Sequence, residues 1–171
     1  MRAFRRRYRY VGRMKPESHP KVQQVQAALH AGGVDVTVRE IDKATPTALA
    51  AAEYLGCEVG AIANSLVFLA DGSPILVLTS GAHRVDTAAL AGRIGADAIT
   101  RATPDDVRAA TGQVIGGVAP VGHPSPVRTY LDVALKAYDE VWAAAGIPAS
   151  LFPISYADLL RVTGATEVEV D

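Results

Sequence analysis

The hydrophobic residues of the chain recur with helical spacing in one early segment and with strand spacing directly after it. Val22, Val25 and Leu29 repeat every three or four residues and a glycine pair follows, which predicts a helix over residues 19–31. Valines then occupy every second position of residues 34–38. This alternation predicts a half-buried strand.

Four further helices are predicted from their capping residues. Thr-Pro pairs open two of them, at Thr45 and Thr103, because the hydroxyl accepts a first-turn N–H and proline fits the first helical position. Asp86 and Ser155 are expected to cap the other two, Ser155 in a pattern that resembles a capping box. Each helix is expected to end at a glycine, respectively Gly56, Gly112, Gly95 and Gly164.

The most apolar segments are residues 65–69 (SLVFL) and 75–78 (ILVL), which flank Asp71-Gly72. Asp-Gly favours a two-residue hairpin turn, and continuous apolar runs are typical of strands covered on both faces, so a central hairpin is predicted. Further short strands are predicted at residues 98–101, 127–133, 141–143, 151–154 and 166–170. Because helices and strands interleave irregularly, we expect an α/β fold with a mixed sheet.

Charge is unevenly distributed along the 171 residues, although 17 Lys and Arg nearly balance 18 Asp and Glu. Residues 1–15 hold seven basic residues and no acid, which leaves a formal charge of −8 on the rest of the chain. Such a run is typical of a solvated, disordered tail, and a phosphate-binding arm is the alternative. We expect a basic tail at residues 1–15 and one domain over residues 16–171.

Several classes of protein are excluded by composition. The single cysteine, Cys57, cannot form an internal disulfide, and the four histidines show no metal-ligand spacing. No apolar run approaches the roughly 20 residues of a spanning helix, and the N-terminus lacks the apolar stretch of a secretory signal. An acidic body argues against a broad nucleic-acid platform but leaves contact with a nucleic-acid end open. The expectation is a cytoplasmic protein without metal or cofactor.

The most unusual segment is residues 116–126 (GGVAPVGHPSP), with three glycines and three prolines. Glycine lets main chain approach a ligand and proline fixes the backbone, so this loop suits recognition of an oxyanion or hydroxyl by main-chain groups. An ordinary tight connection explains it equally well. His123 is a candidate general base or ligand-binding group, and an exposed loop histidine without catalytic duty is the alternative.

Two more polar candidates adjoin the predicted hairpin. Asn64 offers a donor and an acceptor where the first strand begins, or else makes a local turn bond. Arg84 follows the second strand and suits bidentate binding of a phosphate or carboxylate, although an ion pair with Asp86 or a helix-end contact explains it almost as well. We interpret Cys57 as a small apolar side chain, not a nucleophile.

Three stretches in this order, residues 62–68 (IANSLVF), 80–86 (SGAHRVD) and 116–123 (GGVAPVGH), resemble the YbaK/ProX family of aminoacyl-tRNA deacylases. These enzymes are relatives of the editing domain inserted in bacterial prolyl-tRNA synthetases. The third stretch contains the family's GxxxP signature, and the similarity covers residues 19–170. It implies an α/β domain with a mixed, barrel-like sheet flanked by helices, which hydrolyses the ester of a mischarged aminoacyl-tRNA.

The resemblance also implies a site for a small aminoacyl group between the hairpin and the GxxxP loop. There, the 2′-hydroxyl of the terminal adenosine assists hydrolysis while loop main chain orients the ester. The implied catalytic positions are Asn64, Gly116, Gly117 and Pro120. The implied substrate-binding residues are Ser65, Arg84, Val118, Gly122 and His123. The implied partners are the acceptor end of aminoacyl-tRNA and an aminoacyl-tRNA synthetase.

One position departs from the family pattern. Where the family commonly has lysine before its Ser/Thr-Leu pair, this chain has Asn64. Asparagine offers only neutral hydrogen bonds, so a charge-assisted contact of about 1.5–3 kcal/mol is missing unless another cation such as Arg84 replaces it. Retained binding with altered specificity is the preferred interpretation. The alternative function is a non-catalytic domain that binds aminoacyl-tRNA ends or a small amino-acid-like ligand.

Overall fold

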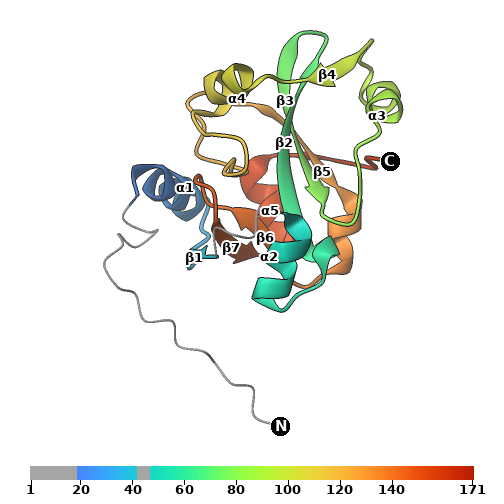
Figure 1. The fold of residues 1–171 in the computed structure, drawn as a ribbon. Coiled ribbons are helices and arrows are strands. Elements are labelled where there is room, and N and C mark those ends of the chain that lie inside the picture. Colours follow the sequence, from blue (N-terminus) through green and yellow to red (C-terminus); the bar gives the residue numbers. More distant parts are fainter. Residues whose placement is uncertain (1–18, 42–46) are drawn as a thin grey trace.

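A mixed sheet of eight strands forms the centre of residues 19–41 and 47–171, the part of the chain that the computed structural model describes (Figure 1). The strands are β1 (Arg39–Glu40), β2 (Ile62–Ala70), β3 (Ser73–Ser80), β4 (Ile99–Arg101), β5 (Arg128–Asp132), β6 (Val141–Ala144), β7 (Ser150–Ile154) and β8 (Thr166–Val168). Their order is β1-β7-β6-β2-β3-β5-β8, and β4 pairs with β2 beside this path.

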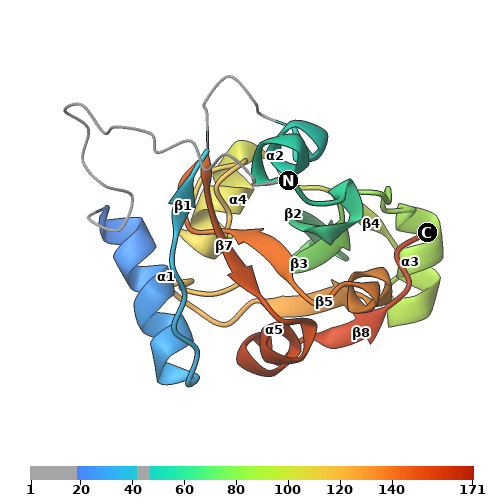
Figure 2. The same ribbon diagram turned by 90° about the horizontal axis from the view of Figure 1, so that it is seen from below.

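Both parallel and antiparallel pairs occur in this sheet. The pairs β2–β6, β3–β5 and β5–β8 are parallel, and the remaining pairs are antiparallel. Figure 2 shows the strands curving around one side of the core, with helices outside them. The predicted fold class, an α/β domain with a mixed, barrel-like sheet flanked by helices, is therefore confirmed.

Five α-helices surround the sheet in the described residues. They are α1 (Pro20–Ala31), α2 (Ala48–Leu55), α3 (Thr87–Ile94), α4 (Pro104–Thr111) and α5 (Tyr156–Thr163), with short 3-10 helices at η2 (Val59–Ala61) and η3 (Val133–Ala137). The predicted caps of α3, α4 and α5 are confirmed, since Asp86, Thr103 and Ser155 each accept a first-turn N–H. All four predicted glycines end their helices.

The cap of α2 and the segment before β1 differ from the predicted pattern. The Thr45-Pro46 pair lies outside the described residues, and α2 is capped instead by Thr47, whose Oγ1 accepts the Ala50 N–H at 3.1 Å. The strand predicted over residues 34–38 is wrong, because the chain pairs with β7 only at β1. The first and last valines of that segment are buried as the alternation indicates, but they pack on the core without a neighbouring strand.

The hairpin of β2 and β3 runs through the middle of Figure 1 and turns at Asp71-Gly72, as predicted. The largest core cluster packs α1 and α5 on one face of this hairpin, and a second cluster packs α3 on the other. Burial on both faces is confirmed for β3, which is fully buried from Ile75 to Ser80. It is wrong for β2, where Leu66 remains 39% exposed.

The exposure of β2 has a topological cause. One edge of β2 pairs with β3 along its whole length, whereas the other edge pairs with β6 only at Ile62 and Ala63 and with β4 only at residues 68–70. Within the described residues, no strand pairs with this edge at residues 64–67. The sheet is therefore open at the segment that contains the predicted Asn64.

Residues 19–41 and 47–171 contain the five α-helices and two 3-10 helices given above. None of the helices in them combines the length and the apolar character needed to cross a membrane.

Candidate functional site

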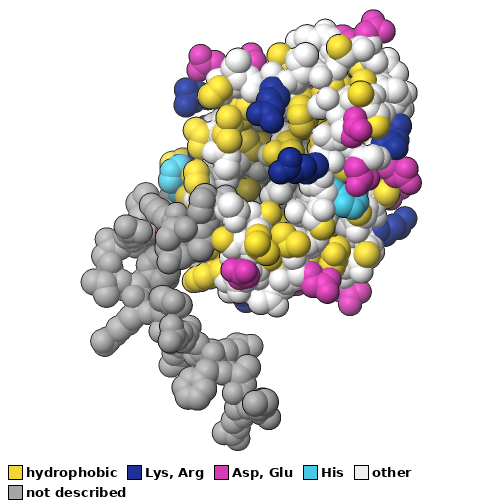
Figure 3. Space-filling model, turned by 45° about the vertical axis from the view of Figure 1, so that its right-hand side comes forward, with side chains coloured by type: hydrophobic (Ala, Val, Ile, Leu, Met, Phe, Trp, Pro, Cys, Tyr) yellow, Lys and Arg dark blue, Asp and Glu magenta, His cyan; other side chains and the backbone are white. Residues whose placement is uncertain are grey.

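A cavity of about 1900 Å³ follows the open edge of β2. Its walls are formed by residues 62–68 of β2, by residues 83–85 and Thr87 after β3, by the loop after α4 and by the turn between β6 and β7. Figure 3 shows a hollow with an apolar floor and basic side chains lying over it. Sites for small ligands usually measure roughly 300–1,000 Å³, so this cavity has room for a group attached to a larger molecule.

Two side chains hold the Gly-rich loop beside this cavity, one through the N–H of Ala119 and the other through its carbonyl. Gln113 Oε1 accepts the Ala119 N–H at 2.7 Å, and His123 Nε2 donates to the Ala119 carbonyl at 2.7 Å. Gln113 is itself only 2% exposed, and its own N–H donates to Thr111 Oγ1 at 3.1 Å. The loop is thus fixed from the C-terminal end of α4 by Gln113 and from its own C-terminal side by His123.

Protonation of His123 is opposed by its surroundings. Burial lowers the pKa of this imidazole, although the bond to the Ala119 carbonyl acts in the opposite direction. A neutral ring with its proton on Nε2 satisfies that carbonyl without placing a charge in the loop. The side chain therefore serves the shape of the loop at neutral pH.

The two leading glycines of the loop differ in their surroundings. Gly116 has φ +86°, and a Cβ at this position would meet nothing within 4 Å. A Cβ on Gly117 would lie 2.6 Å from backbone atoms of Ile147 and Pro148, which real contacts do not allow. Gly117 therefore permits the close packing of the loop on the β6–β7 turn, while Gly116 leaves main chain open toward the cavity.

The structure divides the nine predicted site residues into two groups. Lining the cavity are Asn64, Ser65, Arg84, Gly116 and Val118. Outside its lining are Gly117, Pro120, Gly122 and His123. Members of the second group pack the loop on its neighbours, as Gly122 does against Val25 of α1. The loop and the hairpin thus meet at one cavity, and part of the loop forms its support.

Three basic side chains line the cavity, namely Lys21, Arg84 and Arg101. None of them forms an ion pair with a carboxylate of the described residues. The alternative ion pair of Arg84 with Asp86 is not among the ion pairs of the described residues, and Asp86 Oδ1 accepts the Ala89 N–H as the cap of α3. A group of cations without acidic partners favours an anionic ligand.

Two buried polar atoms in the cavity walls lack hydrogen-bond partners within the described residues. They are Ser65 Oγ and Gln113 Nε2. Ser65 lies between Ala63 and Val67 on the face of β2 that packs with Val118 and Ala119 of the loop, since side chains alternate along a strand. An unsatisfied buried donor costs about 1–3 kcal/mol, so both atoms are candidates to bind a ligand after a small local adjustment.

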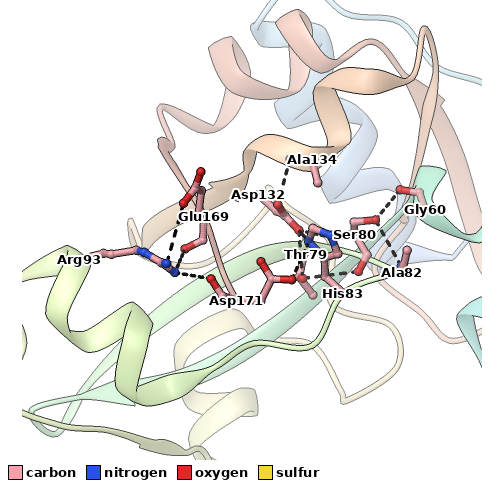
Figure 4. A network of polar contacts seen from close by, with 10 residues as sticks. All are labelled: Gly60, Thr79, Ser80, Ala82, His83, Arg93, Asp132, Ala134, Glu169 and Asp171. Atoms are coloured by element: carbon pink, nitrogen blue, oxygen red, sulfur yellow. Dashed lines mark hydrogen bonds and ion pairs between the residues drawn. The ribbon is translucent and has the colours of Figure 1, made fainter.

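Sequence reasoning missed a polar network at the end of β3 (Figure 4). Asp132, at the end of β5, is 1% exposed and lies 3.0 Å from His83 Nδ1, and His83 lines the cavity. The segment that contains His83 was recognised, but Arg84 was chosen from it. No local signal links His83 to Asp132, because the two residues are far apart in sequence and meet only through the parallel pairing of β3 with β5.

Metal-binding clusters and the cysteine thiol are the remaining features that concern the type of chemistry. Within residues 19–41 and 47–171, no three His, Cys, Asp or Glu side chains gather closely enough to hold a metal ion. Cys57 is half-buried beside the cluster under α2, and burial raises the pKa of its thiol, which agrees with its interpretation as an apolar side chain.

Fold and site together describe an α/β domain with a large cavity, whose lining includes three cations without acidic partners among the described residues. A model of the aminoacyl-tRNA editing domain matches residues 42–162. The chain therefore belongs to the aminoacyl-tRNA editing domain family, and the resemblance inferred from its three motifs is confirmed. The curated proline–tRNA ligases in the comparison are much longer proteins, and the chain corresponds to only a small part of each.

Individual relatives agree with this assignment. The crystal structure of a candidate trans-editing enzyme for prolyl tRNA synthetase is 42% identical, with a TM-score of 0.82, and covers 90% of this chain and 98% of the other. The proline–tRNA ligase of Nitratidesulfovibrio vulgaris (strain Hildenborough) is 35% identical over 83 residues, 48% of this chain and only 14% of the ligase. The uncharacterised protein YwhH of Bacillus subtilis is 34% identical over 110 residues, 64% of this chain and 69% of YwhH.

Proposed function

We propose that this chain is a trans-editing deacylase that removes a small amino acid from a mischarged tRNA of the tRNA-Pro-like class. Family membership supports hydrolysis of an aminoacyl ester as the reaction. The 42% identity to a candidate trans-editing enzyme for prolyl tRNA synthetase supports the substrate class. The observation that carries the proposal is the cavity at the open edge of β2, which is lined by the Gly-rich loop and by cations that have no acidic partner in residues 19–41 and 47–171.

Binding is proposed to involve only the acceptor end of the tRNA. Lys21, Arg84 and Arg101 are placed to contact its phosphates, because they line the cavity and have no acidic partner in the described residues. A small number of such contacts suits a body whose formal charge is −8. The acidity of the body thus limits how much of the tRNA is contacted and leaves the chemistry unaffected.

Chemistry is proposed to occur beside Gly116. Main-chain groups of the loop orient the ester carbonyl, and the 2′-hydroxyl of the terminal adenosine helps to position the attacking water. Asn64 contributes neutral hydrogen bonds, and Arg84 supplies the cation that the family places at that position. Ser65 and Val118 bound the space for the aminoacyl side chain.

The four predicted residues outside the cavity lining are proposed to act through the loop. Gly117 and Gly122 allow its close packing, and Pro120 is buried beneath it. His123 holds the Ala119 carbonyl. These residues position the main chain that contacts the substrate, and we propose no direct substrate contact for them.

Partner and location follow from the substrate class. Aminoacyl-tRNA is produced by synthetases and used in the cytoplasm, so the protein is proposed to act there, alongside a synthetase that makes the mischarged product. Residues 1–15 lie outside the described residues, and the basic arm they form in sequence is proposed to add contacts to tRNA phosphates.

A deacylation panel tests the proposed function directly. Purified protein is incubated with tRNAs charged with alanine, serine, cysteine or proline, and release of labelled amino acid is measured. Faster release from at least one mischarged tRNA-Pro than from correctly charged tRNA-Pro is expected. If the protein binds every aminoacyl-tRNA in the panel and releases none, the enzyme proposal is lost and the non-catalytic binding domain replaces it. The non-catalytic alternative is favoured by one observation, which is that Asn64 stands where the family commonly has lysine.

A further inference from the structure

The network around Asp132 holds a carboxylate in one orientation inside the protein. Its Oδ2 accepts the Ser80 N–H at 3.0 Å and the Thr79 hydroxyl at 3.4 Å, and its Oδ1 accepts the Ala134 N–H at 2.9 Å. Three donors from the surrounding fold thus fix the orientation of this carboxylate at a position that is 1% exposed. His83 Nδ1, at 3.0 Å from Oδ2, is the fourth contact (Figure 4).

This contact selects one form of the neutral imidazole. An N–H at Nδ1 donates to the carboxylate, which leaves the lone pair on Nε2. Nε2 makes no hydrogen bond to any described residue, and the His83 side chain is 31% exposed. His83 also belongs to the cavity lining. A proton acceptor of fixed orientation is therefore presented at the wall of the site.

The register of the hairpin places this pair beside Asn64. Asn64 is directly opposite Thr79 in the β2–β3 ladder, and opposite residues project from the same face with Cβ atoms about 4.5–5.5 Å apart. Thr79 in turn donates to Asp132. The carboxylate–imidazole pair thus adjoins the position where this chain lacks the lysine of its family.

Other cavity-lining groups are less suited to accept a proton. The lining also includes an imidazole and a carboxylate that can accept a proton, those of His19 and Glu40. His19 Nδ1 already accepts the Lys21 N–H at the start of α1, and Glu40 belongs to the edge strand β1. Among the described residues, a buried carboxylate orients His83 through a contact of 3.0 Å.

We propose that His83, oriented by Asp132, is the general base of the deacylation reaction, an inference that rests on the proposed function. Nε2 takes a proton from a water molecule while the water oxygen bonds to the ester carbonyl carbon. The tetrahedral intermediate then breaks its bond to the ribose oxygen, which receives the proton from Nε2. The products are the free amino acid and a tRNA with its hydroxyl restored, so atoms and charge balance.

The test compares His83→Gln with a matched control, His30→Gln. His30 also pairs through Nδ1 with an aspartate, Asp35, at 2.6 Å, but it is exposed on α1 and outside the cavity lining. Single-turnover deacylation of the best substrate from the panel is measured for the wild type first, because an inactive wild type overturns the proposed function and says nothing specific about His83. A wild type that is active makes the His83 result decisive.

With an active wild type, His83→Gln is expected to lower the single-turnover rate by about 10²-fold or more, with substrate affinity changed less than threefold. The rise of the rate with pH should vanish in this variant, and added imidazole should restore part of the rate of His83→Ala. Besides Asp132, Asp171 faces the ring at 3.8 Å and Arg84 adjoins it in sequence, so Asp171→Asn is included to separate their effects on the pH profile.

Two outcomes overturn the proposal. One is a folded His83→Gln protein whose rate lies within twofold of the His30→Gln control. The other is a loss that appears only as weaker substrate binding, with an unchanged rate at saturation, which assigns His83 to binding. Asp132→Asn can fail to fold because four contacts depend on it, so folding is checked by thermal unfolding and the decision rests on His83→Gln and imidazole rescue.

Discussion

Gln113 and Ala119 are joined across the Gly-rich loop by a buried hydrogen bond of 2.7 Å from the Ala119 N–H to Gln113 Oε1. This bond closes the turn that presents Gly116 to the cavity. Gln113→Leu keeps a similar volume but leaves the Ala119 N–H buried without a partner. We expect the free energy of unfolding to fall by about 1–3 kcal/mol and kcat/KM for deacylation to fall by about tenfold to hundredfold.

The control for this prediction is Gln24→Leu, which changes an exposed glutamine on α1. It should leave both quantities unchanged within error. Denaturant titration and steady-state deacylation measure the two effects separately. A Gln113→Leu protein with normal stability and full activity would show that the loop keeps its shape without this bond.

The two adjacent loop glycines should respond differently to the same methyl group. Gly117→Ala places a Cβ against the backbone of Ile147 and Pro148, so stability should fall by about 1–3 kcal/mol as the loop is pushed off the β6–β7 turn. Gly116→Ala meets no neighbour, and its cost of about 1–2 kcal/mol comes from the positive φ alone.

Activity separates these two variants further. The added methyl of Gly116→Ala enters space next to the cavity, and we expect it to raise KM for the aminoacyl-tRNA. Gly116→Val should abolish turnover, since its larger side chain fills more of that space. Unchanged kinetics in a folded Gly116→Val protein would remove this position from the site.

Protonation of His123 should destabilise the protein in mildly acidic solution. Its pKa in the folded state is lowered from 6.5 by burial, so the unfolded chain binds the proton more readily than the folded one. The stability that the neutral ring contributes is therefore complete above pH 6.5 and is lost as the pH falls through 6.5 toward the lowered value. Thermal unfolding at pH 7.5 and 5.5 measures the loss.

His123→Gln isolates this effect from the other histidines. Its amide can still donate to the Ala119 carbonyl but does not titrate in this range. We expect a smaller drop in melting temperature between the two pH values than in the wild type. Equal drops in both proteins would show that other groups account for the acid sensitivity.

Local signals in the sequence identify most of the elements because capping and turn formation depend on neighbouring residues. Thr103, Asp86 and Asp71-Gly72 each act within a few residues of their own position, and all are placed correctly. The segment 34–38 failed because pairing depends on a partner strand elsewhere in the chain. Alternating valines predict which side chains are buried but not whether the segment pairs with a strand, and the valines at both ends of the segment are indeed buried.

The site was predictable only as far as its motifs extend. Asn64, Arg84 and the GxxxP loop were recognised from contiguous stretches, and they meet at one cavity. Tertiary packing brings three other features to that cavity, namely Lys21, Arg101 and the pair of His83 with Asp132. No spacing in the sequence predicts their position there. The opening in β2 could not be inferred either, since it depends on how far β4 and β6 extend along one edge.

Asn64→Lys should strengthen the interaction with the anionic substrate. A charge-assisted hydrogen bond exceeds a neutral one by about 1 kcal/mol, which corresponds to an increase of about fivefold in kcat/KM. Asn64→Gln lengthens the side chain without adding charge and serves as the control. Identical activity and substrate range in all three proteins would show that the departure from the family pattern is neutral.

Salt dependence should separate the cavity cations from the basic residues near the N-terminus. If Arg84 contacts one phosphate of the single-stranded acceptor end, Arg84→Gln lowers the slope of log affinity against log salt by about 0.7. Deleting residues 1–15 removes seven cations and should lower the slope further, without changing which amino acid is released. Arg108→Gln is the control, since Arg108 lies outside the cavity lining and near Asp105. Only cations that displace counterions from phosphates contribute to this slope. If Arg84→Gln leaves the slope unchanged and the deletion reduces it, the phosphates are bound by the N-terminal segment and not by Arg84.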